Sequence, residues 1–185
     1  MRRQGDIGVW KNLIDERLCS NLISFYENEF PLAKTRDEDR CEDSYKFLYD
    51  EPLRKQYGRY LRDCGDEYFA FYGHDTWRKQ SMPITMKIQK TMPGQKGFQG
   101  IHWEQGAGLE NACRYAAWMT YLNDIDVEDG GKTAFPLQGS SFTPSQGTTL
   151  IWPAGYTHPH HAYPALTGET PKYIITGWFE YTPSK

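Results

Sequence analysis

The sequence has no long apolar run and no concentration of charge of one sign. No apolar stretch approaches the roughly 20 residues that a membrane-spanning helix needs, so we expect no membrane partner. Basic residues are scattered among acidic ones and the net charge is −3. This distribution indicates no nucleic-acid partner, because nucleic-acid binding normally requires a basic patch or stripe.

Closely spaced cysteines are also missing. Cys19, Cys41, Cys64 and Cys113 form no CxxC motif, and the start, MRRQGDIGVW, lacks the apolar segment of a secretory signal peptide. Four cysteines permit two disulfides, but nothing else in the sequence indicates an oxidising compartment. We therefore interpret the cysteines as reduced thiols in a cytoplasmic protein.

The chain nevertheless has enough apolar material for one hydrophobic core. It has 185 residues, of which 38% are hydrophobic, and six tryptophans and thirteen tyrosines supply much of the surface to be buried. This length fits one domain, 1–185, and the sequence specifies no oligomeric state. We expect a helical N-terminal support over about 10–80 and a β core over about 84–182.

The N-terminal third has the spacing of helices. Leu18 and Leu22 recur at helical spacing, and Asp15 precedes them as a helix cap. A second, longer amphipathic helix is predicted over 45–72, with a break near Pro52. Between them, residues 35–44 are charged and almost free of aliphatic residues, which predicts a solvated loop. The alternative is a flap beside the mouth of an active site.

The remainder of the chain reads as short strands separated by Gly, Pro and Asp. The segments that carry this pattern are ITMKIQKT, FQGIHWE, RYAAWMTYLND, GGKTAF, GTTLIWPAG and KYIITGWFEY. Strands of this composition with such punctuation predict an antiparallel β core, a jelly roll or barrel-like sandwich. The predicted fold class is therefore α+β, mainly β, with the N-terminal helices packed on one sheet.

Two segments carry residues that bind transition metals. His102 and Glu104 stand two apart in GIHWEQ, so in an extended strand both side chains leave the same face. A histidine cluster, THPHHAYP, follows late in the chain and offers His158, His160 and His161. Two imidazoles and one carboxylate form the facial triad that holds iron(II) with open positions. An HxE pair by itself is common and is weak evidence for a metal site. The other motifs in the chain strengthen this interpretation.

The order of HxE, GGKTAF, GTTLIWPAGYTHPHHAYP and KYIITGWFEY resembles the iron(II)/2-oxoglutarate-dependent dioxygenases. The likeness covers roughly residues 86–181 and is greatest to the prolyl 4-hydroxylase-like branch, including its small phage and bacterial members. It implies a double-stranded β-helix, also called a cupin-like jelly roll, with His102 and Glu104 from one strand. The distal histidine would come from the seventh strand. The family commonly places proline four residues after that histidine, which favours His160 over its neighbours because Pro164 follows. Many relatives have Asp in place of Glu104.

The resemblance also implies how 2-oxoglutarate is bound. Lys172 stands where this branch has the lysine that pairs with the C5 carboxylate, and Tyr121 resembles the family tyrosine that contacts the same group. Thr176 lies four residues after Lys172, on the same face of a strand. Relatives often have tyrosine at the position of Met92, so we expect Gln89 to contact the co-substrate instead. The loop 168–172 is longer than in compact members.

The implied activity is hydroxylation of a C–H bond, with a prolyl residue in a peptide or protein as the favoured substrate and a small molecule as the other option. The resemblance implies Fe(2+), 2-oxoglutarate and O2, and it admits ascorbate as an additional cofactor. Two alternatives remain at this point. One is a cupin-like metalloprotein that uses no 2-oxoglutarate, and the other is a non-catalytic jelly-roll binding module. Trp152 and Trp178 are expected in the core or the pocket wall.

Overall fold

The computed structural model describes residues 1–74, 77–82 and 85–182. Its strands are β1 (Arg2–Gln4), β2 (Ile7–Trp10), β3 (Lys34–Glu38), β4 (Cys41–Phe47), β5 (Ser81–Met82), β6 (Met86–Thr91), β7 (Gly97–Phe98), β8 (Arg114–Tyr121), β9 (Thr133–Phe135), β10 (Ser140–Phe142), β11 (Thr149–Pro153), β12 (His161–Ala162) and β13 (Lys172–Tyr181). Its helices are α1 (Glu16–Asn28), α2 (Glu51–Phe71), α3 (Trp77–Gln80) and α4 (Leu109–Ala112), with 3-10 turns η1 (Val127–Asp129) and η2 (Pro136–Gln138).

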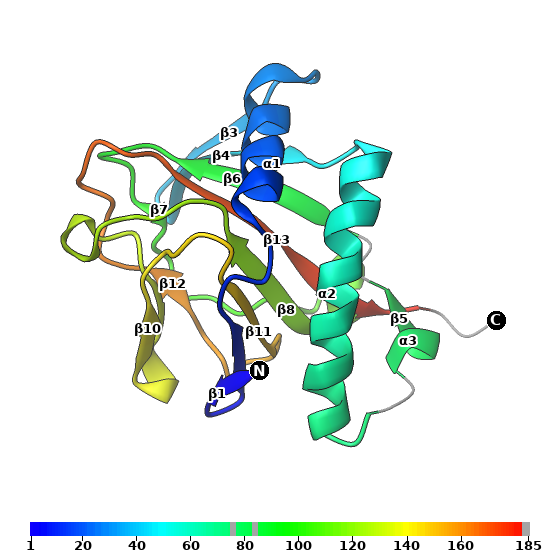
Figure 1. Ribbon diagram of the computed structural model, residues 1–185. Coiled ribbons are helices and arrows are strands. Elements are labelled where there is room, and N and C mark those ends of the chain that lie inside the picture. Colours follow the sequence, from blue (N-terminus) through cyan, green and yellow to red (C-terminus); the bar gives the residue numbers. More distant parts are fainter. Residues whose placement is uncertain (75–76, 83–84, 183–185) are drawn as a thin grey trace.

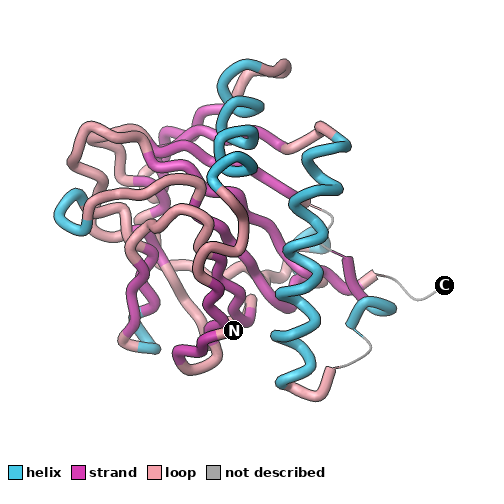
Figure 2. Tube along the Cα trace, viewed as in Figure 1, coloured by secondary structure: helices cyan, strands magenta, loops and turns pink. Residues whose placement is uncertain are grey.

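The strands form two antiparallel sheets (Figure 1). The larger sheet has the order β1-β2-β11-β8-β13-β6-β4-β3, with β5 added beside β13 and β7 beside β4. The smaller sheet has the order β10-β9-β12. Figure 2 shows the strands gathered behind α1 and α2. This arrangement confirms the predicted α+β, mainly β fold class, a double-stranded β-helix with helices against one sheet.

Strand β8 separates two hydrophobic cores because its side chains alternate between the faces of the large sheet. Ala116 and Trp118 belong to the core beneath the helices. Ala117, Met119 and Tyr121 belong to a second core, which lies between the two sheets. The sequence RYAAWMTY is apolar at nearly every position because both faces of this central strand are covered.

Helix α1 begins where the sequence predicts. The Asp15 carboxylate caps it by accepting a hydrogen bond from the Leu18 amide at 2.8 Å. Leu18, Leu22 and Phe25 follow on one face and are buried against the sheet. None of the helices in the described residues combines the length and apolar character needed to cross a bilayer.

The predicted loop at 35–44 is wrong. The segment is a β-hairpin, in which β3 pairs with β4 from Lys34 opposite Tyr45 to Glu38 opposite Cys41. Its charged composition has two causes. Strand β3 is an edge strand with mostly exposed side chains, and Asp43, which is only 3% exposed, is neutralised by Arg36 across the hairpin. Composition alone therefore hid a strand pair.

The predicted helix at 45–72 is correct only from Glu51 onward. Residues 45–47 belong to β4, which continues the sheet beside β6. The helix starts where Asp50 accepts a hydrogen bond from the Leu53 amide at 2.7 Å, and Pro52 lies in its first turn instead of breaking it. The expected helical support over about 10–80 thus also supplies β3 and β4 to the large sheet. Residue 84, the expected start of the β core, lies outside the described residues, as do residues 183–185.

Candidate active site

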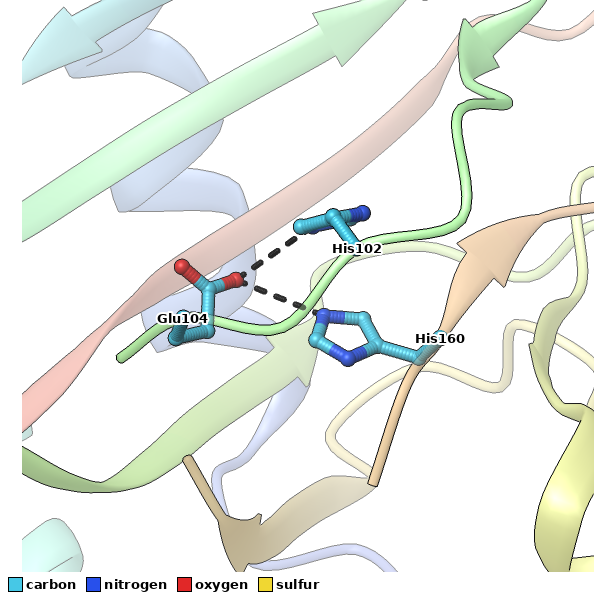
Figure 3. A group of neighbouring side chains, drawn as sticks. All are labelled: His102, Glu104 and His160. Atoms are coloured by element: carbon cyan, nitrogen blue, oxygen red, sulfur yellow. Dashed lines mark ion pairs between the residues drawn. The ribbon is translucent and has the colours of Figure 1, made fainter. Parts of the chain in front are cut away.

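His102, Glu104 and His160 converge on one point at the mouth between the sheets (Figure 3). Oε1 of Glu104 lies 3.5 Å from Nε2 of His102 and 3.3 Å from Nε2 of His160. One ligand atom from each residue lies within 4.8 Å of the other two. Two imidazole nitrogens and one carboxylate oxygen at such separations can share a single metal ion on one face, leaving its other positions open.

The backbone holds the two histidines side by side. His102 and His160 form an isolated antiparallel bridge, in which each amide donates to the other residue's carbonyl at 3.1 and 2.9 Å. The predicted strand FQGIHWE is therefore shorter than expected: regular pairing is limited to β7, and His102 lies in an extended segment with this one bridge. The predicted common face is confirmed, since His102 and Glu104 both line the same cavity.

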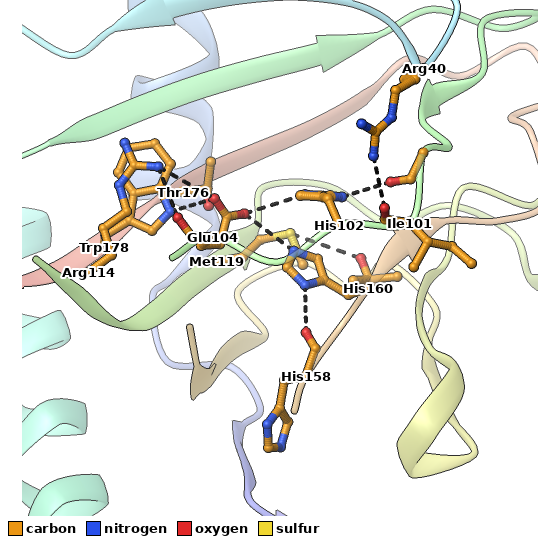
Figure 4. A network of polar contacts seen from close by, with 12 residues as sticks. Arg40, Ile101, His102, Glu104, Arg114, Met119, His158, His160, Thr176 and Trp178 are labelled. Atoms are coloured by element: carbon orange, nitrogen blue, oxygen red, sulfur yellow. Dashed lines mark hydrogen bonds and ion pairs between the residues drawn. The ribbon is translucent and has the colours of Figure 1, made fainter. Parts of the chain in front are cut away.

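Each imidazole is oriented by its other ring nitrogen. Nδ1 of His102 lies 2.8 Å from the Gly100 carbonyl, and Nδ1 of His160 lies 3.1 Å from the His158 carbonyl (Figure 4). A carbonyl oxygen can only accept, so each Nδ1 carries a proton and each Nε2 faces the shared point. Such a hydrogen bond to the far ring nitrogen is the usual support of a metal-binding histidine.

The second oxygen of Glu104 is held from the opposite side. Nε1 of Trp178 donates to Oε2 at 2.8 Å, and the Arg114 guanidinium lies 3.8 Å from the same oxygen. Burial acts to raise the pKa of Glu104, but hydrogen bonds and charge from His102 and His160 outweigh it and hold the pKa well below its ordinary value. The carboxylate is thus ionised and ready to bind a cation.

The other two histidines of the cluster are not part of this group. His158 is buried, and its Nδ1 lies 2.9 Å from the Thr157 hydroxyl, while its own carbonyl supports His160. His161 is the first residue of β12, lines the cavity and stacks on Tyr163 with ring centroids 5.6 Å apart.

A cavity of about 300 Å³ adjoins the three converging side chains. Met119, Trp152, Ile174 and Trp178 are among its apolar walls, as expected for the two tryptophans. Lys172 also lines it. This side chain is only 6% exposed, and its ammonium donates to the Gly131 carbonyl at 2.6 Å without an acidic hydrogen-bond partner in the described part of the chain. Burial lowers the pKa of Lys172 to about 8, against a raising effect of Asp43.

Of the other residues predicted from the sequence to bind 2-oxoglutarate, two line the cavity and Tyr121 does not. Thr176 and Gln89 line the cavity, although the Thr176 hydroxyl donates to the Trp118 carbonyl at 2.8 Å. Tyr121 is fully buried and lies behind the cavity wall. Its hydroxyl donates to Phe142 and Thr133 oxygens, and its ring lies 5.7 Å below the Lys172 ammonium. After the loop at 168–172, Lys172 lies opposite Thr91 of β6.

Met92 does not enter the cavity. Its side chain is 41% exposed, whereas Lys87, Gln89 and Thr91 of β6 face inward. The alternation of a strand allows only one of Thr91 and Met92 to do so.

Several cavity residues were not found from the sequence. Arg36 and Asp43 come from the hairpin at a position where the sequence predicts a loop, and Lys87 precedes Gln89 on the inward face of β6. Arg40, in the hairpin turn, donates to the Ile101 carbonyl at 2.9 Å and so fixes the segment that carries His102. The alternation of side chains over residues 35–47 is a signal that could have indicated strands there. The contacts of these residues in the cavity, however, depend on the packing of distant strands.

This geometry can be compared with known proteins. Residues 86–180 match the 2OG-Fe(II) oxygenase superfamily over just more than half of the chain. The chain belongs to this superfamily. Members use iron(II) and 2-oxoglutarate, and the converging histidines and Glu104 beside a buried lysine fit both groups. The match favours an oxygenase over the cupin-like metalloprotein and the binding module considered above.

Curated relatives are similar over a short segment. The chain is 36% identical over 77 residues to prolyl 4-hydroxylase subunit alpha-1 of Gallus gallus and 33% identical to the Homo sapiens protein. In both cases the match covers 38% of this chain and 14% of the relative. The chain thus corresponds to a small part of these longer proteins.

Solved structures share the whole fold. A Pseudomonas putida prolyl-4-hydroxylase superposes with a TM-score of 0.73 at 16% identity, covering 96% of this chain and 94% of that one. A viral collagen prolyl hydroxylase from Paramecium Bursaria Chlorella virus-1, in a 2OG complex, gives 0.71 at 15% identity over 95% and 96%. A Trichoplax adhaerens prolyl hydroxylase bound to a hypoxia inducible factor peptide gives 0.62 at 18% identity over 95% and 83%.

Proposed function

We propose that this protein hydroxylates a C–H bond of a prolyl residue in a peptide or protein, with iron(II) held by His102, Glu104 and His160. One observation carries the proposal: three metal-binding atoms converge beside a cavity in which a buried ammonium, that of Lys172, has no acidic hydrogen-bond partner in the described part of the chain. A buried cation of this kind is costly unless a ligand supplies the missing charge. The C5 carboxylate of 2-oxoglutarate is such a ligand.

Thr176, Gln89 and Tyr121 complete our proposal for the co-substrate site. Thr176 and Gln89 line the cavity in which the dicarboxylate would bind, while Tyr121 supports Lys172 from behind by placing its ring under the ammonium. The Tyr121 hydroxyl is occupied by its own hydrogen bonds, so its contribution to the carboxylate is indirect.

The protein's own part in the reaction is placement and exclusion of water. Bound iron(II) supplies the redox chemistry that activates O2 and the C–H bond. The two Nδ1–H groups keep each Nε2 aimed at the metal position, Trp178 and Arg114 keep the carboxylate of Glu104 turned toward it, and the apolar walls shield the reacting carbon from solvent.

A peptide or protein substrate is supported by the relatives. Prolyl 4-hydroxylase subunits match 77 residues of the chain, and the Trichoplax protein of the same fold was solved with a peptide. We further propose a single working domain in a reducing, cytoplasmic setting. Strands from the first 50 residues pair with those of the β core, and all four cysteines are free. We also propose ascorbate as a reductant that keeps the iron in the iron(II) state.

The test is oxygen-dependent formation of succinate with iron(II) and 2-oxoglutarate, combined with mass spectrometry of proline-rich peptides for an added oxygen atom. We expect wild-type activity and its loss in Glu104→Ala. His160→Ala should abolish iron binding, whereas His161→Ala should retain it, which separates the two histidines. Lys172→Met should weaken 2-oxoglutarate at least about 30-fold while iron still binds. Absence of succinate across peptides and small molecules alike would contradict the proposal.

A further inference from the structure

Strand β6 turns Lys87 toward the cavity, on the same face as Gln89 and Thr91. Its ammonium lies 5.4 Å from the ring centroid of Tyr45 and 5.4 Å from that of Trp178. Within the described residues, Lys87 forms no hydrogen bond and no ion pair. Two aromatic faces therefore hold a cation at the cavity wall and leave its three N–H donors without an acceptor.

Both arginines of the cavity have acidic partners. Arg36 makes a double hydrogen bond to Asp43, at 2.7 and 2.5 Å. Arg114 contacts Glu180 at 3.4 Å and the carboxylate of Glu104 at 3.8 Å. Asp43 and Glu104 are the acidic groups whose charge acts on Lys87, but each already contacts an arginine and neither contacts Lys87.

In the proposed function, the two other anions near the cavity already have partners and are not available to Lys87. Glu104 is assigned to the metal, and the C5 carboxylate of 2-oxoglutarate to Lys172. With both groups in place, Lys87 is a cavity cation without a direct ion pair among the described residues. A cation without a direct partner in a partly desolvated site is unfavourable, so its position indicates an anionic ligand that arrives with the substrate.

The register of the sheet separates the two lysines. Lys172 lies opposite Thr91, and Lys87 lies opposite Thr176, so the two are four residues apart along the paired strands β6 and β13. At the rise of a β-strand this is about 13 Å. Lys87 therefore lies well away, along the strands, from the lysine assigned to the C5 carboxylate. Lys87 lies toward the end of the cavity where Trp178 contacts Glu104, which is where the substrate must meet the metal.

We propose that Lys87 binds a carboxylate of the primary substrate, so that the enzyme selects a target carbon flanked by an acidic group. This inference rests on the proposed function and specifies its substrate class. The carboxylate has two sources of the same chemistry: the side chain of a Glu or Asp next to the target proline in a peptide, or the α-carboxylate of a free amino acid.

The first experiment measures binding and does not require turnover. Protein loaded with Mn(II) and 2-oxoglutarate is titrated calorimetrically with a proline peptide that has Glu beside the proline, and with the same peptide carrying Gln. Both peptides are capped at the two ends. Free proline and prolinamide form the second pair, which isolates the α-carboxylate. We expect the wild type to bind the acidic member of one pair about 10-fold or more tightly than the neutral member.

Three variants test whether Lys87 causes the preference for the acidic member of the pair. Lys87→Met should bind both members of the pair equally, and Lys87→Arg should restore much of the preference because it restores the charge. Lys90→Met is the matched control: Lys90 lies on the same strand outside the cavity and pairs with Glu27 at 2.8 Å, so its loss should leave the preference unchanged.

Equal affinity of the wild type within both pairs, including no binding of any member, would overturn the proposal. So would a preference that survives in Lys87→Met. If Lys87→Met instead weakens 2-oxoglutarate itself, the lysine belongs to the co-substrate site and the proposal is wrong. The proposed function fails by a different result, namely no succinate from the wild type with any substrate.

Discussion

The indole Nε1–H of Trp178 donates to Oε2 of Glu104 at 2.8 Å, across a separation of 74 positions in the chain. Trp178 is on β13, in the middle of the large sheet, whereas Glu104 lies in the irregular segment between β7 and α4. A residue of the central sheet thus orients a carboxylate from a segment without regular strand pairing. Oε1 is left to face the two histidines.

Replacing this N–H should weaken the metal site without removing a ligand. Trp178→Phe keeps an aromatic ring under Arg114, which lies 3.5 Å from the Trp178 ring centroid, but deletes the donor to Glu104. We expect the affinity for iron(II) to fall roughly 10–100-fold, as is usual when a residue that orients a metal ligand is lost. The measurement is competition with a metal chelator. Trp103→Phe, at a 52% exposed position next to the ligands, is the control and should bind iron(II) normally.

Lys172 should destabilise the protein in the absence of ligand. Burial lowers its pKa from 10.5 to about 8, so between these values the unfolded chain binds more protons than the folded one. The stability contributed by this group therefore rises with pH across that window. Lys172→Met removes the penalty, so we expect it to be at least as stable as wild type at pH 7, with an advantage that shrinks by about 1 kcal/mol by pH 9.

Urea unfolding of both proteins at the two pH values measures this difference. The comparison with wild type is needed because burial raises the pKa values of the Cys19 and Cys41 thiols, to about 11 and about 12, and these thiols act in the opposite direction in both proteins. An equal loss of stability at pH 7 and pH 9 would instead indicate that Lys172 serves mainly through its hydrogen bond to Gly131.

Lys46 should be structural and not functional. It is 3% exposed, and its ammonium donates to the carbonyls of Phe25, Tyr26 and Glu29, where α1 ends. The Phe25 carbonyl also accepts from the Glu29 amide, whereas the Tyr26 carbonyl belongs to the last turn, where a helix leaves carbonyls without partners. Lys46→Met should cost about 3 kcal/mol of unfolding free energy, because buried carbonyls lose charged donors. Urea denaturation measures it, and Lys55→Met, at an exposed helical ion pair with Glu51, should change stability by less than about 0.5 kcal/mol.

Two glycines should respond in opposite ways to alanine. A Cβ on Gly177 would lie 2.0 Å from the Thr85 carbonyl oxygen and 2.5 Å from the Trp118 ring, so Gly177→Ala should cost about 2 kcal/mol or more. A Cβ on Gly58, within α2, would meet Met86 at 3.5 Å, an ordinary contact. Gly58→Ala should be neutral or stabilising by up to about 1 kcal/mol, since alanine favours the helix. Thermal unfolding distinguishes the pair, and equal effects would contradict the packing described for β13.

Local patterns were sufficient where a single segment decides its own structure. The cap at Asp15, the strand KYIITGWFEY and the shared face of His102 and Glu104 all follow from side-chain chemistry and strand or helix periodicity within a few residues. The hairpin at 34–47 did not follow, because its charged residues look like a loop until Arg36 and Asp43 are placed opposite each other.

The sequence by itself determined the mainly β fold class, the chemistry available for a metal and the lysine on the last long strand. Only the tertiary structure decided that His160, and not His158 or His161, joins His102 and Glu104, since that depends on a backbone bridge between distant segments. It also decided that Tyr121 lies behind the cavity wall and that Lys87 lines the cavity without an ion pair in the described residues. The physical reason is that periodicity assigns a residue to a face of its own strand, whereas the partner across that face comes from packing between strands far apart in the chain.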